Sequence, residues 1–169
     1  MSETETSETG DKKPAKDDHT FLVVVDESDE LQQALFYACQ TAVRTNGRVA
    51  LLKVVAPAEF QHWASVGELM REEQREEAED LLRTISAGVQ QRTGSMPIMH
   101  IREGEIEEEL VSLINEDESI CTLVLGAATG DYGPGPLVSA LVNQLSGKLR
   151  VPITVVPGSL TQAQISAIT

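Results

Sequence analysis

The stretch FLVVVDESDELQQALFYA, residues 21–38, decides the fold class. It opens with the continuous apolar run Phe21–Val25, which is typical of a strand buried on both faces. After a short acidic turn, apolar residues recur at helical spacing, at Leu31, Ala34, Leu35, Ala38 and Ala42. Ser28 can serve as the helix N-cap, with Asp29 and Glu30 in the first turn, where acids complement the helix dipole. The stretch predicts a buried strand that leads directly into an amphipathic helix.

The same alternation of strand and helix continues along the chain. Four more apolar runs predict strands at residues 49–55, 97–101, 120–125 and 151–156. Helical stripes lie between them, at residues 78–89, 106–114 and 137–149. Five strands alternating with four helices require a parallel sheet with helices on both faces, which is an α/β three-layer sandwich. Ligands of such sheets bind at the carboxyl ends of the strands, so we expect a site just after Val25 and just after Leu125.

The composition indicates one globular domain and excludes some partners. The chain has 169 residues, and Lys+Arg 13 against Asp+Glu 27 gives a formal net charge of -14. This charge repels nucleic acids and anionic lipids, and no apolar run approaches the ~18 residues of a membrane helix. Cys39 and Cys121 lie in apolar segments, as buried thiols do in a reducing compartment. We expect a cytoplasmic protein that binds neither nucleic acid nor membrane.

The acids are concentrated in three segments. Residues 1–19 carry six acids and three lysines with almost no apolar side chains, which predicts a disordered acidic tail. Glu68–Asp80 holds seven acids and Glu103–Glu118 holds eight, both interleaved with helix-spaced apolar residues. We interpret these two blocks as solvated helix faces, and an acidic docking surface for a protein partner is the alternative. The predicted domain spans residues 20–158, and residues 159–169 form a C-terminal tail.

Unusual residues follow the first and the fourth strand. Asp26 either caps the helix together with Ser28 or belongs to a ligand site. After Leu125 comes GAATGDYGPGP, residues 126–136, with four of the chain's 12 glycines. A strand, a Gly-rich loop and a helix can cradle a phosphate, because glycines let backbone N–H groups approach an anion closely. The alternative is an ordinary connection stiffened by two prolines, and neither a P-loop nor a dinucleotide fingerprint fits these residues.

From Phe21 to Pro157 the sequence resembles the universal stress proteins. The resemblance rests on VDES at 25–28, LLKV at 51–54, Gly104 before the third helix, and VPITVV at 151–156. It implies an adenine nucleotide alpha hydrolase-like fold with the strand order 3-2-1-4-5. It also implies a non-enzymatic stress-response or regulatory module with protein partners, and a homodimer that pairs through the last strand at Val151, Ile153 and Val155.

Nucleotide-binding members of that family carry G-x2-G-x9-G-[ST] after the fourth strand, and the pattern starts here at Gly126. The resemblance implies that Asp26 holds the adenosine end, that Val54 offers backbone contacts to the base, and that the loop wraps the phosphates. Thr129 replaces the second glycine, Ala140 replaces the final hydroxyl residue, and Asp131 would repel a polyphosphate. The candidate nucleotide-binding residues are Asp26, Ser28, Val54, Leu125, Gly126, Ala128, Thr129, Gly130, Ser139, Ala140 and Leu141.

We therefore expect a degenerate adenine-nucleotide site with no certain cofactor and no metal site. The alternative is a functional ATP or AMP switch, in which Gly130 supplies the missing glycine, Ser139 supplies a hydroxyl and Mg²⁺ neutralises charge. An enzyme is the third hypothesis, but the chain has no nucleophile elbow, and we interpret His100 as structural. Residues 57–67, which hold Trp63, are interpreted as a packed loop, and a lid over the site is the alternative.

Overall fold

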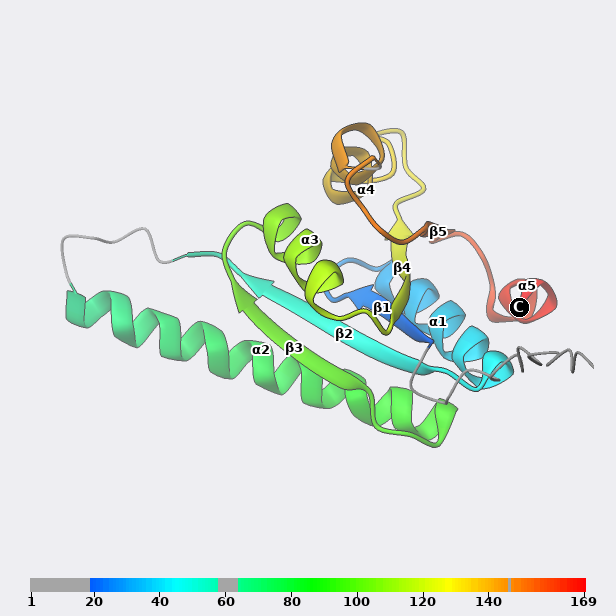
Figure 1. Ribbon diagram of the computed structural model, residues 1–169, viewed down its shortest axis with the longest axis horizontal. Coiled ribbons are helices and arrows are strands. Elements are labelled where there is room, and N and C mark those ends of the chain that lie inside the picture. The colour runs from blue at the N-terminus through cyan, green and yellow to red at the C-terminus, as the bar shows by residue number, and fades with distance from the viewer. Residues whose placement is uncertain (1–18, 58–63, 146) are drawn as a thin grey trace, which may run out of the picture.

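The computed structural model describes residues 19–57, 64–145 and 147–169 (Figure 1). Residues 1–18 of the predicted tail and residues 58–63 of the predicted loop lie outside the described residues. The strands form one parallel five-stranded sheet in the order β3-β2-β1-β4-β5, which confirms the predicted fold class and strand order. The strands are β1 (Thr20–Val24), β2 (Arg48–Val55), β3 (Ile98–Glu103), β4 (Ile120–Ala127) and β5 (Ile153–Pro157).

The central strand β1 explains why its sequence is continuously apolar. It lies between β2 and β4, and all five of its residues are buried. Phe21 and Val23 point to one face of the sheet and join a core that includes Leu35 of helix α1 (Leu31–Thr45). Leu22 and Val24 point to the other face and join a second core, to which residues of the helices at 106–116 and 136–140 also belong. Because helices cover both faces, both sets of alternating positions must be apolar.

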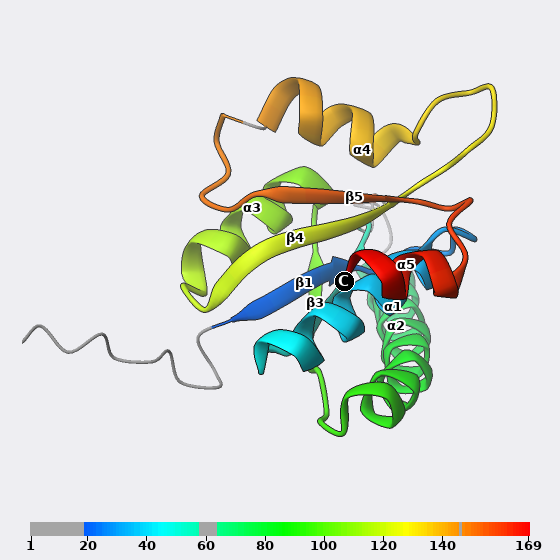
Figure 2. The same cartoon turned by 90° about the vertical axis from the view of Figure 1, so that its right-hand side faces the viewer.

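Helices form the outer layers of the sandwich. Helix α2 (Ala64–Thr93) packs on the same side as α1, while α3 (Ile106–Glu116) and α4 (Pro136–Ala140) contribute to the second core. Figure 2 shows α4 on one side of the sheet and α1 and α2 on the other. No helix in the described ranges is long and apolar enough to span a membrane.

The helix predicted up to Leu149 is shorter than its apolar stripe. Helix α4 ends at Ala140, and a π-helical turn, Leu141–Leu145, continues it. The amides of Lys148 and Leu149 then both donate to the carbonyl of Leu145, which closes a turn. This turn returns the chain to the sheet, where Val151 is only 7% exposed. Val151 is part of the domain's own core, and its role at a dimer interface stays a prediction.

The last segment of the chain, predicted as a tail, holds a fifth helix. Helix α5 (Gln162–Ile168) begins with a capping box in which Thr161 and Gln164 bond each other's backbone amides. Ile165 is fully buried against the core beside α1, and Gln40 of α1 donates to the hydroxyl of Ser166. Four helices and a C-terminal tail are therefore corrected to five helices, because one buried isoleucine is too little to form a visible apolar stripe.

Candidate functional site

The residues after β1 form a closed local turn. The amide of Val25 still donates to the Leu52 carbonyl of β2, at 2.8 Å. Asp26 then accepts two hydrogen bonds on the same carboxylate oxygen, from the Ser28 amide at 3.0 Å and from the Ser28 hydroxyl at 2.6 Å. One oxygen of Asp26 therefore already has two donors within the chain.

This turn corrects the predicted start of helix α1. The helix begins at Leu31, and its N-cap residue Glu30 makes no side-chain capping bond. Asp29 and Glu30 therefore precede the helix and do not form its first turn. Ser28 lies two residues before the N-cap position and does not cap the helix, and its hydroxyl donates to Asp26.

The turn borders a cavity at the carboxyl ends of β1 and β4. The cavity measures about 210 Å³. Five predicted site residues line it, namely Asp26, Ser28, Leu125, Gly126 and Ala128. The loop and the start of α4 close the opposite wall with Pro134, Gly135, Pro136, Leu137 and Val138. The first three belong to the predicted Gly-rich loop, and none of the five was named as an individual candidate residue. The predicted position of the site, where the strand order reverses, is therefore where a cavity forms.

The other candidate residues do not line this cavity. Val54 lines a neighbouring hollow between β2 and α2, together with Glu27 and Lys53. Thr129 and Gly130 are exposed in the loop beyond the cavity. Ser139 and Ala140 lie in α4 but outside the lining, and Leu141 is fully buried in the core. The side chain of Leu141 therefore packs inside the domain, and its role as a ligand-contacting residue stays a prediction.

The shape of the loop depends on two of its glycines. Gly133 has φ +84° and Gly135 has φ +102°, in the region that side chains rarely adopt. Their conformations fold the loop back, so that the Ala128 amide donates to the Pro134 carbonyl at 3.2 Å. Gly133 and Gly135 therefore allow the loop to bend, and the spacing of the motif did not predict this role.

Gly126, the motif residue that fits the family pattern, is required by packing. A Cβ atom at this position would lie 2.5 Å from the carbonyl oxygen of Glu30. At Gly158, just after β5, a Cβ would lie 2.6 Å from the Cγ of the same Glu30. Glu30, the residue before α1, thus packs between Gly126 and Gly158. Close packing alone therefore explains why residue 126 is a glycine, without any bound ligand.

The cavity carries negative charge only. Its charged lining residues are Asp26 and Glu30, and no Lys or Arg of the described residues lines it. The free carboxylate oxygen of Asp26 and the apolar walls suit hydroxyl groups and a flat apolar ring. A polyphosphate in this cavity would approach two carboxylates, and like charges repel each other.

His100 lies in the middle of β3, away from this cavity, and was predicted at the end of that strand. Its Nε2 atom is buried and has no hydrogen-bond partner within the described ranges. Burial lowers the pKa of His100, and the nearby Arg102 lowers it further. The residue as a whole is partly exposed, so its structural role stays a prediction. In the described part of the chain, no three His, Cys, Asp or Glu side chains gather as metal ligands.

The sheet and its helices are similar to those of known proteins, although no curated protein is significantly similar to the chain in sequence. Among solved structures, the universal stress protein UspA from Lactobacillus plantarum is 21% identical with a TM-score of 0.68, over 82% of this chain and 97% of that one. A protein of the universal stress protein family from Burkholderia pseudomallei is 19% identical with a TM-score of 0.62, over 85% and 99%.

Two of the similar structures contain a nucleotide, cAMP in one and dAMP in the other. The universal stress protein from Archaeoglobus fulgidus in complex with dAMP is 17% identical with a TM-score of 0.55, over 82% of this chain and 97% of that one. These likenesses show a shared fold. The sequence model of the universal stress protein family matches residues 19–157, which covers every strand of the sheet. The chain therefore belongs to the universal stress protein family.

Proposed function

We propose that this chain is a non-enzymatic stress-response module whose adenine-nucleotide site is degenerate. The observation that carries the proposal is the acidic cavity at the ends of β1 and β4, where Asp26 and Glu30 are the charged lining residues. The cavity lies where a nucleotide would be expected in this fold, at the carboxyl ends of β1 and β4, and its two carboxylates disfavour the binding of phosphates. Regulation would then act through protein contacts and not through ATP turnover.

Titration calorimetry with ATP and with ADP, each with and without Mg²⁺, tests the proposal. We expect no heat of binding at millimolar nucleotide, because each phosphate approaches two carboxylates. Asp26→Ala serves as the matched control, since it removes one acid and the contact expected for adenosine. Nucleotide that copurifies in stoichiometric amounts, or heat that disappears in the Asp26→Ala variant, would instead establish a functional site.

A nucleotide-responsive switch for AMP-class ligands is the second candidate function. It is favoured by one observation, that Asp26 and Gly126 line the same cavity at the switch point of the sheet. The relative from Archaeoglobus fulgidus holds dAMP, which carries a single phosphate. Titration with AMP and dAMP separates the two candidates, because one phosphate suffers less repulsion than three. Saturable binding of AMP together with no binding of ATP supports this second candidate.

We also propose that the module is a homodimer paired through β5. In the described part of the sheet β5 pairs with β4 alone, so one edge of β5 is free. The Gly158 amide and the Pro152 carbonyl both bond to β4, and backbone groups alternate along a strand. Ile153 and Val155 therefore direct their backbone groups to the free edge. A second copy that pairs there would satisfy these groups and cover Val155, which is 37% exposed.

A further inference from the structure

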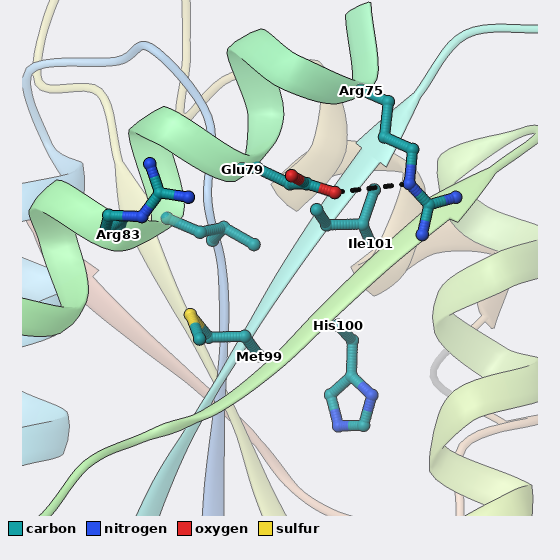
Figure 3. Close-up of a pocket in the computed structure, with 7 residues that line it drawn as sticks. Arg75, Glu79, Arg83, Met99, His100 and Ile101 are labelled. Atoms are coloured by element: carbon teal, nitrogen blue, oxygen red, sulfur yellow. Dashed lines mark hydrogen bonds and ion pairs between the residues drawn. The ribbon is translucent and has the colours of Figure 1, made fainter. Parts of the chain in front are cut away.

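A groove runs along β3, at the opposite edge of the sheet from β5. The larger part of the groove measures about 480 Å³ and lies between α2 and β3, with Arg75, Arg83, Met99 and Ile101 in its lining (Figure 3). A second hollow of about 220 Å³ shares Arg75 and Ile101 and continues to Glu103. The two hollows together follow the strand over most of its length.

The floor of this groove is an unpaired strand edge. Among the described strands, β3 pairs with β2 only. The amide of Gly104 donates to the Val55 carbonyl of β2, and backbone groups alternate along a strand. His100 and Arg102 therefore bond toward β2, while Met99, Ile101 and Glu103 turn their amides and carbonyls to the free edge. An edge of this kind is a template for another extended segment.

Apolar surface adds to this template. Met99 is 48% exposed. Figure 3 shows Met99 and Ile101 on the side of α2, and His100 on the other side of the strand. Charges that would repel a pairing strand are found only at the carboxyl end of β3, in Arg102 and Glu103. The first four residues of β3 therefore leave the edge open.

The walls of the groove carry both signs of charge, because four arginines lie there together with Glu72, Glu79 and Glu103. Arg71, Arg75 and Arg83 lie on α2, and Arg102 lies on β3. The α2 arginines pair with acids of the domain, Arg71 with Glu103 at 3.2 Å and Arg75 with Glu79 at 3.3 Å. These pairs are solvent-exposed, and exposed pairs contribute little, so an incoming carboxylate can share or replace the partners.

We propose that residues 2–9 of the same chain, SETETSET, bind the free edge of β3 as a sixth, antiparallel strand. Glutamate and threonine alternate over residues 3–6, so that Glu3 and Glu5 share one face of a strand and Thr4 and Thr6 the other. The β-branched threonines favour an extended backbone. With the glutamates on the side of α2, their carboxylates reach Arg71 and Arg75. The segment gains little from apolar burial, and its tether supplies the missing affinity.

The connection is long enough for binding within one chain. The sheet order places β3 two strands from β1, so an added strand lies three interstrand steps, about 15 Å, from β1. Residues 10–18 can span about 30 Å when extended. The chain enters β1 at the amino end of the parallel sheet, so a segment tethered there runs antiparallel to β3. A short tether of this kind gives an effective concentration in the millimolar range.

Amide hydrogen exchange of the full chain, measured residue by residue by NMR, tests the proposal. The comparison is with a Ser7→Pro and Thr9→Pro double variant, which keeps every charge and removes two amides that face β3, because Ser7 and Thr9 share the strand face of Glu3 and Glu5. We expect the amides of Met99, Ile101 and Glu103 to exchange about threefold or more slowly in the parent chain, which corresponds to the segment being bound about two-thirds of the time. The amides of His100 and Arg102, which bond to β2, are internal controls and should not change.

A matched variant and two conditions complete the experiment. Ala15→Pro places a proline in the connection and should leave the protection intact. Sodium chloride at about 1 M should reduce the protection, because the glutamate–arginine contacts are screened. Equal exchange at Met99, Ile101 and Glu103 in the parent and the double variant would overturn the proposal. Protection that rises with protein concentration would also overturn it, since the strand would then come from a second copy.

Discussion

The contact between Gly126 and Glu30 decides how the best-matching motif residue should be understood. Replacing Gly126 with alanine places a Cβ atom 2.5 Å from the Glu30 carbonyl oxygen and 2.8 Å from its carbon. Both are backbone atoms, so the strand end or the start of α1 must shift. We expect Gly126→Ala to lower the free energy of unfolding by about 1–3 kcal/mol, as overpacking does. Urea unfolding followed by circular dichroism measures this change.

Gly130 provides the control for that measurement. It lies in the same loop, a Cβ atom added to it would meet no neighbour within 4 Å, and its φ is not positive. Gly130→Ala should therefore change the free energy of unfolding by less than about 0.5 kcal/mol. If both variants were equally stable, the packing explanation of Gly126 would be wrong and a ligand role would regain support.

Glu116 shows how one surface carboxylate becomes strongly acidic. Hydrogen bonds from Arg102 and then from Ser112 lower the pKa of Glu116 from 4.5 to about 2. Because the pKa of Glu116 is lower in the folded state, its ionised carboxylate stabilises the fold at pH values above 4.5. This contribution to the free energy of unfolding is lost as the pH falls from 4.5 toward 2. NMR titration of the Glu116 carboxyl should give a midpoint near 2.

The Arg102→Gln variant separates the two hydrogen bonds. It keeps the Ser112 hydroxyl and removes the charged donor, so the Glu116 midpoint should move upward toward its ordinary value. The acid limb of the stability curve should then move to higher pH as well. A midpoint near 4.5 in the parent protein would show that the Arg102 contact does not persist in solution.

At the scale of elements, α5 determines where the domain ends. The side chain of Ile165 is completely buried, whereas Ile168 in the same helix is 66% exposed. We expect Ile165→Ala to cost about 2–5 kcal/mol of unfolding free energy, and Ile168→Ala less than about 0.5 kcal/mol. Chemical denaturation of the two variants measures the difference. Equal stabilities would return residues 159–169 to the status of a tail.

Sequence reasoning succeeded for the strands and failed at their connections for a physical reason. A strand buried on both faces must be apolar at every position, so Phe21–Val25 was recognisable without any contact information. The start of α1 was predicted too early, because the bonds between Asp26 and Ser28 are a local choice that helix periodicity does not encode. The bend at Gly133 and Gly135 likewise depends on backbone angles, so the loop at residues 126–136 was recognised but its individual lining residues, such as Pro134, were not.

At the scale of the whole molecule, charge is distributed unevenly between the two edges of the sheet. Most of the acids lie in the N-terminal segment and on the solvated faces around α2 and α3, while β4 and β5 carry none. The uncharged edge at β5 and the edge at β3, where arginines and glutamates line the groove, therefore offer different chemistry to their partners. An apolar edge suits a second copy of the same strand, because identical apolar surfaces do not repel each other.

This difference predicts the effect of a charge placed on each edge. In the proposed dimer, Val155→Lys puts two lysines close together at the β5 pairing, so we expect the dimer dissociation constant to rise at least about tenfold. Val66 of α2 is 48% exposed and lies away from β5, which makes Val66→Lys the matched control with an unchanged constant. Sedimentation equilibrium over a micromolar dilution series measures both constants. A parent chain that stays monomeric throughout the series, or a Val155→Lys variant that dimerises as well as the parent, would show that β5 does not carry the dimer.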